Sequence, residues 1–170
     1  MGWLWNSIHD VFDIEDGSYP EICICGLTSQ QVVSGYNFLR SKARRLKGIP
    51  TFYSIESHEE VGLDAMGNAA EFVTRRVAKP FHFVISSLKY NNATLYDIGV
   101  FVLDNAISID FKRSLIWGEI EIETLLLIVQ EIKGNSTESF LQIGSVDDPT
   151  TTRSRINEAL IKLQNPDEDW

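Results

Sequence analysis

The stretch Pro80–Phe111, PFHFVISSLKYNNATLYDIGVFVLDNAISIDF, decides the fold that this sequence predicts. It consists of three runs rich in β-branched and aromatic residues, which are typical of strands. The runs are separated by Asn91-Asn92 and by Asp104-Asn105, and two-residue connections of this kind favour tight hairpin turns. We therefore expect an antiparallel β-meander over about residues 80–112.

Four segments outside the meander have the apolar spacing of amphipathic helices. The most ambiguous is GEIEIETLLLIVQEIKG (118–134), which alternates glutamate and isoleucine at its start. Its apolar positions from Ile122 to Ile132 nevertheless follow helical spacing, and the segment is too long for a single strand. The predicted helices span about residues 28–47, 66–78, 118–133 and 149–164.

Together these elements predict one α+β domain over residues 1–170, in which helices pack on a central antiparallel sheet. Residues 1–20 predict a short N-terminal helix and an acidic linker, and residues 165–170 predict a loose acidic tail. The segment EICICG (21–26) is apolar on both faces, which favours a central strand.

The two cysteines of that strand are candidates for a metal site or a disulfide. Cys23 and Cys25 would point to the same strand face, which is poor geometry for a mutual disulfide. A zinc site would need a second cysteine pair, and the three histidines are scattered along the chain. We therefore expect buried free thiols, as in a reducing compartment, and no bound metal or cofactor.

The balance of charge limits the partners. The chain carries 24 acidic and 15 basic residues, a net charge of −9, which opposes binding to nucleic acid or to anionic membranes and favours a basic protein partner. No run approaches the roughly 20 apolar residues of a membrane helix. The first ten residues lack the basic character of a signal peptide, so we expect a cytoplasmic protein.

The acidic residues supply the candidate partner-binding surface. We expect a small acidic protein-binding module, comparable to a bacterial immunity protein that neutralises a basic toxin or enzyme. The glutamates also have a structural explanation, because negative charge in the first turn of a helix is stabilised by the helix dipole. The candidate residues are Glu119, Glu121 and Glu123 in one helix, Asp147 and Asp148 before the last helix, and Asp13, Glu15 and Asp16 in the N-terminal linker.

The alternative is a small-ligand-binding protein or an enzyme with its site near His82. A histidine at the start of a strand is commonly half-buried and bonded to the backbone, but it is also the side chain best suited to proton transfer near neutral pH. Tyr53 and Trp117 are the aromatic residues that we expect beside it. The chain lacks a nucleophile elbow and a phosphate-binding glycine loop, which favours a binding module over an enzyme.

Overall fold

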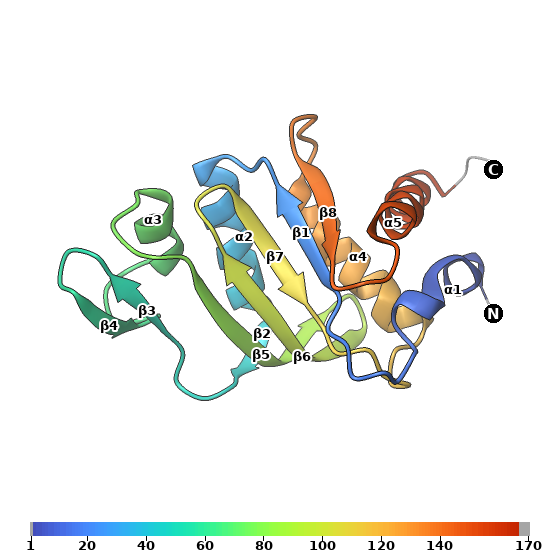
Figure 1. The fold of residues 1–170 in the computed structure, drawn as a ribbon, viewed down its shortest axis with the longest axis horizontal. Helices are drawn as coiled ribbons and strands as arrows, with labels where there is room; N and C mark the ends of the chain where they lie inside the picture. The colour runs from blue at the N-terminus through green and yellow to red at the C-terminus, as the bar shows by residue number, and fades with distance from the viewer. Residues whose placement is uncertain (1, 167–170) are drawn as a thin grey trace.

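The computed structural model describes residues 2–166, which fold into an α+β domain built on a six-stranded antiparallel sheet (Figure 1). The strand order is β2-β5-β6-β7-β1-β8. A separate two-stranded sheet is formed by β3 and β4. The strands are β1 (Glu21–Cys25), β2 (Ala43–Leu46), β3 (Thr51–Ser54), β4 (Glu59–Gly62), β5 (Phe81–Tyr90), β6 (Ala93–Val102), β7 (Ala106–Asp110) and β8 (Phe140–Gly144).

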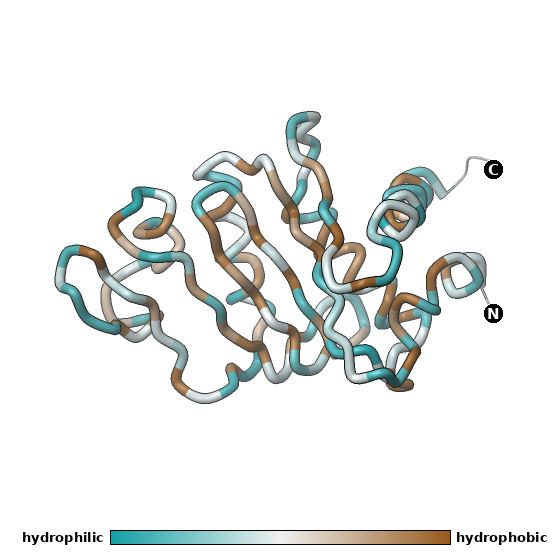
Figure 2. The backbone as a smooth tube through the Cα atoms, in the orientation of Figure 1, coloured by the Kyte–Doolittle hydropathy of each residue, from teal (hydrophilic) through white to brown (hydrophobic). Residues whose placement is uncertain are grey.

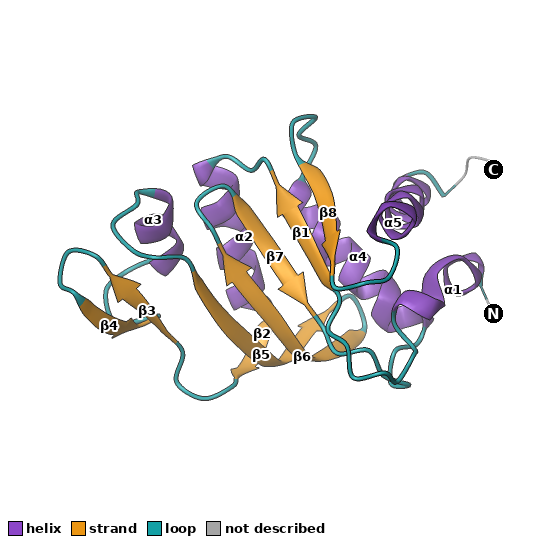
Figure 3. Cartoon of the chain, in the orientation of Figure 1, coloured by secondary structure: helices purple, strands orange, loops and turns teal. Residues whose placement is uncertain are grey.

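Within residues 2–166, helices cover one face of the large sheet (Figure 3). Two helices, α2 and α4, lie behind the sheet, while α1 and α5 pack against each other near β8. The opposite face of the central strands carries no helix from the described part of the chain. The helices are α1 (Trp3–Ile8) with a 3-10 turn at His9–Val11, α2 (Ser29–Lys42), α3 (Ala69–Thr74), α4 (Glu119–Lys133) and α5 (Pro149–Gln164).

The predicted meander is confirmed as β5, β6 and β7, which are consecutive neighbours in the sheet. Asn91 and Asn92 form the first turn with φ angles of 42° and 58°, a conformation that asparagine tolerates better than most residues. The second turn is closed by a 3.0 Å hydrogen bond from the Leu103 amide to the Ala106 carbonyl. The segment 21–25 is also confirmed as a central strand, because β1 lies between β7 and β8.

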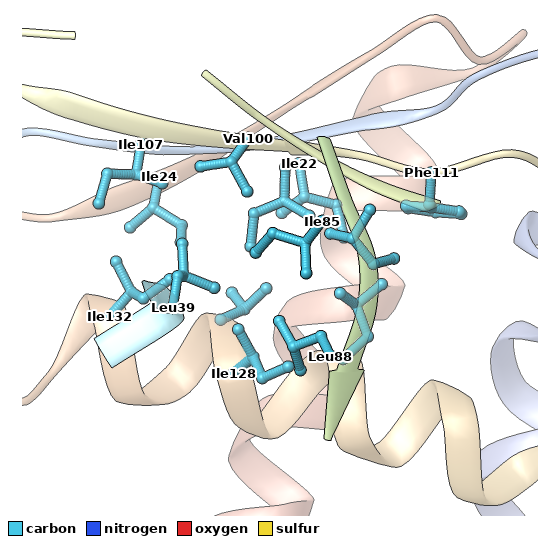
Figure 4. Packing of buried hydrophobic residues seen from close by; sticks show 14 of the residues in the cluster. Ile22, Ile24, Leu39, Ile85, Leu88, Val100, Ile107, Phe111, Ile128 and Ile132 are labelled. Atoms are coloured by element: carbon cyan, nitrogen blue, oxygen red, sulfur yellow. The ribbon is translucent and has the colours of Figure 1, made fainter. Parts of the chain in front are cut away.

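The core lies between the sheet and the pair α2 and α4. Apolar residues follow the central strands (Figure 2). The buried apolar residues of α4 are Ile122, Leu125, Leu126, Ile128, Val129 and Ile132. Ile107 of β7 meets Leu39 of α2 and Ile132 of α4 where the three elements converge (Figure 4). Gly35 of α2 makes this close approach possible, because a Cβ atom there would lie 2.8 Å from Ile107 Cδ1.

Two predicted helices are shorter than expected. The helix predicted over 28–47 ends at Lys42, and Ala43–Leu46 forms the edge strand β2. Arg44 and Arg45 are exposed on this strand, where charge protects a sheet edge from pairing with another chain. The helix predicted over 66–78 spans only Ala69–Thr74, because Asn68 caps it and a φ of 59° at Arg76 prevents its continuation.

The other boundaries agree with the prediction to within about one residue. The helix α4 begins after Gly118, and α5 begins at Pro149. Residues 167–170, which include most of the predicted acidic tail, lie outside the described part of the chain. Between residues 2 and 166, no helix is both long enough and apolar enough to cross a membrane.

Candidate functional site

The meander changes its buried face partway along β5 and β6. On β5 the buried residues Ile85 and Leu88 are three positions apart, and on β6 the same is true of Leu95 and Ile98. A regular strand buries every second residue, so both strands must be irregular at this level. Asp97 has a φ of +49°, an unusual value inside a strand, and marks the irregularity on β6.

This irregularity places two neighbouring side chains in solvent. Tyr96 is 57% exposed, and the adjacent Asp97 is also exposed, although neighbouring strand residues normally point to opposite faces. Backbone strain of this kind is concentrated at functional sites. The bend in the meander is therefore a candidate place for a site.

His82 and Asp110 meet on the uncovered face of the sheet, next to this bend. The Nε2–H of His82 on β5 donates a 2.7 Å hydrogen bond to Asp110 Oδ2 on β7. The intervening strand β6 has Gly99 opposite Asp110, and a Cβ atom at that position would lie 2.2 Å from the carboxylate oxygens. The missing side chain of Gly99 allows Asp110 to reach across β6. His82 is therefore exposed and bonded to a carboxylate, not half-buried and bonded to the backbone as expected.

The neighbouring polar groups of the uncovered face are also paired. The buried hydroxyl of Ser108 donates a hydrogen bond to Glu21. The Sγ atoms of Cys23 and Cys25 lie 2.9 Å apart. Both cysteines are half-exposed, not buried as expected from the sequence. Burial and the contact with Cys25 nevertheless raise the pKa of Cys23 to about 12, so its thiol is protonated at neutral pH.

A pocket of about 300 Å³ lies beside His82. Its walls come from distant parts of the sequence: the loop before β1, the residue after β2, strands β5 and β6, the end of β7 and the loop before α4. Trp117 is held in place by a 2.9 Å hydrogen bond from its Nε1–H to the Lys112 carbonyl. The lining residues are Tyr19, Lys47, His82, Val84, Tyr96, Asp97, Asp110, Lys112, Ser114, Ile116 and Trp117.

The structure brings together two of the three predicted ligand-site residues. His82 and Trp117 line the same pocket. Tyr53 lies apart from them on β3, where the Lys79 ammonium group is 4.7 Å from the centre of its ring. Tyr19, Tyr96 and the lysines of the pocket were not anticipated, because only the strand register and the loop paths bring them to His82.

Two of the predicted partner-binding glutamates have structural roles in α4. Glu119 accepts a 3.0 Å hydrogen bond from the Gly2 amide, and this contact attaches the N-terminal segment to the helix. Glu121 accepts one of 3.1 Å from the Gly118 amide at the start of the helix. The third, Glu123, is half-buried. Two of the three predicted glutamates therefore also have local structural roles, and partner binding by these residues stays a prediction.

Three of the predicted aspartates also have local contacts. Asp148 caps α5 by accepting from the Thr151 amide at 3.0 Å. Asp13 is 3.0 Å from His9, and Asp16 is 2.7 Å from Arg113. The remaining two predicted residues, Glu15 and Asp147, are exposed and make no hydrogen bond or ion pair between residues 2 and 166.

A further group of carboxylates lies on the segment 48–74, which we call the arm. The arm projects from one side of the sheet (Figure 1). The arm contains β3, β4 and α3 and has no lysine or arginine. Three large apolar side chains are exposed on it: Ile49 (92%), Ile55 (42%) and Met66 (49%). Its carboxylates are Glu56, Glu59, Glu60, Asp64 and Glu71.

The arm is attached to the body by specific contacts. The Arg40 guanidinium of α2 donates two 2.8 Å hydrogen bonds to the Asp64 carboxylate. The ring of Phe52 packs between Phe72 of the arm and Phe81 at the start of β5. These contacts fix the position of the arm relative to the sheet. The absence of basic residues from 48 to 74 could have identified this surface from the sequence.

No group of three or more histidine, cysteine, aspartate or glutamate side chains in residues 2–166 is arranged to hold a metal ion. The pair of His82 and Asp110 shares its pocket with the side chains of Lys47, Asp97 and Lys112. No family model, curated protein or solved structure matches this chain.

Proposed function

We propose that this chain is an acidic protein-binding module that holds a basic protein against its arm. The observation that carries the proposal is that one projecting segment combines exposed apolar side chains with four glutamates, Glu56, Glu59, Glu60 and Glu71, that form no ion pair between residues 2 and 166. Charge complementarity accelerates association and selects the partner, and desolvation of apolar groups supplies affinity. The arm offers both.

The position of the individual groups supports this proposal. Glu56 and Glu59 are exposed at the tip of the β3–β4 hairpin and have no ion-pair partner between residues 2 and 166. Ile55 lies next to Glu56, so an apolar contact and a charged contact would be made by the same turn. Isolated exposed apolar residues are ordinary on a protein surface, but three on one projecting segment favour an interface.

The biological role that we propose is neutralisation of a basic toxin or enzyme, as immunity proteins perform. A neutralising protein needs no catalytic group, only a surface that covers its partner. The net charge of −9 supports a basic partner over a nucleic acid or an anionic lipid surface.

The test is capture of the partner by the tagged protein in its native host, at low and at high salt. The arm variant is Glu56→Lys with Glu59→Lys. The matched control is Glu131→Lys with Glu138→Lys, which makes the same charge change at exposed positions in α4 and in the loop after it. Each reversed contact is expected to cost about 1 kcal/mol, so the arm variant should bind about 30-fold more weakly than the control.

A basic protein that is captured in stoichiometric amounts, released by salt and lost only in the arm variant is the expected result. If both variants capture that protein equally, the arm is not the binding surface. If the wild-type protein retains no basic partner at low salt, the proposal is wrong.

A further inference from the structure

The pocket beside His82 has a different chemistry from the arm. Two of its lining residues, Lys47 and Lys112, are exposed and form no ion pair with any residue between 2 and 166. Arg44 and Arg45 are exposed on β2 just before Lys47. Two ammonium groups with no ion-pair partner between residues 2 and 166 therefore line this pocket, and they favour an anion.

The two carboxylates of the pocket, Asp97 and Asp110, differ in how far they oppose the binding of an anion. Asp110 is already engaged by His82, and only 30% of its side chain is exposed. Asp97 is exposed and unpaired in the described part of the chain, so it can accept a hydrogen bond from a ligand. A ligand that fits all of these groups carries an anionic group for the lysines and an N–H or O–H for Asp97.

The walls of the pocket favour a planar apolar body. Tyr19 is 52% exposed, and Ile116 is 66% exposed, so large apolar surfaces face solvent around one small volume. Tyr96 joins them because of the irregularity at Asp97. Aromatic walls with a few fixed polar groups are typical of small-molecule sites, and a volume of about 300 Å³ accommodates one or two rings.

We infer that this pocket binds a small organic anion with a planar ring system. The anionic group lies toward Lys47 and Lys112, and the rings lie against Tyr19, Tyr96 and Ile116. His82 contributes a ring edge that Asp110 holds in one orientation. This binding site is separate from the arm and does not depend on the proposed protein partner.

The probe for the test is 8-amino-1-naphthalenesulfonate, which has a planar body of two fused rings, an amino group and a sulfonate. Its neutral counterpart, 1-naphthylamine, keeps the rings and the N–H groups but lacks the anion. Titrations followed by fluorescence compare the wild type with Lys47→Met/Lys112→Met and with the control Lys89→Met, an exposed lysine of β5 outside the pocket.

We expect saturable binding of the sulfonate to the wild type and to Lys89→Met, and binding about tenfold weaker to the double variant, since two exposed charge contacts are lost. The neutral probe should bind the wild type and the double variant within about twofold of each other. Tyr96→Ala should weaken both probes, and the arm variant Glu56→Lys/Glu59→Lys should weaken neither.

Equal affinity of the sulfonate for the wild type and the double variant would overturn the inference. Binding of the sulfonate that Tyr96→Ala leaves unchanged would also overturn it, because the probe would then lie elsewhere. Absence of saturable binding to the wild type would have the same meaning.

Discussion

Gly35 is the position where a single added methyl group tests the packing of α2 against the sheet and α4. A Cβ atom at residue 35 would lie 2.8 Å from Ile107 Cδ1 and 3.0 Å from Ile132 Cγ2. Both atoms belong to fully or nearly fully buried side chains, so they have little space in which to move. Gly35→Ala therefore sets a gain in helix propensity against overpacking of the core.

The two effects have opposite signs and different sizes. Replacing glycine by alanine inside a helix stabilises it by about 1 kcal/mol. Overpacking by one methyl group in a close-packed core costs about 1–3 kcal/mol. We expect the free energy of unfolding to fall by about 1 kcal/mol, which lowers the melting temperature of a domain of this size by about 3 °C.

Ile107→Val supplies the matching half of a double-mutant cycle, because valine lacks the Cδ1 atom that meets the new methyl group. Alone it should cost about 1 kcal/mol, since it leaves a small cavity. In the Gly35→Ala background it should cost little, so the coupling free energy should be about 1 kcal/mol. Urea denaturation of the four proteins measures each value.

Ser34→Ala is the control, because Ser34 is the exposed neighbour of Gly35 on the same helix and reports propensity without packing. It should raise stability by a few tenths of a kcal/mol. A stabilisation by Gly35→Ala of about 1 kcal/mol, with no coupling to Ile107→Val, would refute the close approach of α2 to β7 and α4.

Three further changes test contacts elsewhere in the domain. The Arg155 guanidinium hydrogen-bonds to Asp10 and lowers the pKa of that carboxyl below its ordinary 3.8. The pair therefore contributes stability above pH 3.8, and this contribution is lost as the pH falls through the lowered pKa. Asp10→Asn should weaken the dependence of the free energy of unfolding on pH in this acidic range. The raised pKa of Cys23, about 12, predicts slow alkylation by iodoacetamide at about pH 8 and faster alkylation at higher pH, and peptide mass spectrometry that finds the rate of a free thiol would contradict it. Glu119→Ala removes the acceptor of the Gly2 amide, so hydrogen exchange should accelerate in α1 while β6 stays protected.

Much of the fold could be predicted from the sequence because its signals are local. The asparagine turn at 91–92 and the β-branched strands on either side predict pairing between neighbours in the chain, and that pairing needs no long-range information. The start of α5 was similarly readable from Asp148 and Pro149, whose side chains act on the adjacent backbone. The end of α2 at Lys42 could not be predicted from the sequence. Pairing with β5 makes Ala43–Leu46 a strand, although its two arginines favour a helix.

The candidate site was less predictable because it depends on strand register and on the paths of loops. His82 could be singled out as a residue type, but its contact with Asp110 requires a glycine opposite Asp110 on the strand between them. The role of the acidic residues could not be decided from the sequence for a related reason: a carboxylate next to a helix start, such as Glu121, is as easily a cap as a contact for a partner. The three-residue spacings at 85–88 and 95–98 were a usable signal of the bend.

The place of the arm in the chain has an evolutionary consequence. It is inserted between β2 and β5, which are antiparallel neighbours, so it occupies the position of a hairpin loop. The Lys47 amide, just after β2, donates a hydrogen bond to the Val84 carbonyl of β5. The six-stranded sheet is therefore continuous without the inserted segment. Apart from the residues that attach it to the body, the arm can accumulate substitutions or change length while the six-stranded scaffold stays the same. Under the proposed function, a change confined to this segment would alter partner binding without altering the six-stranded sheet.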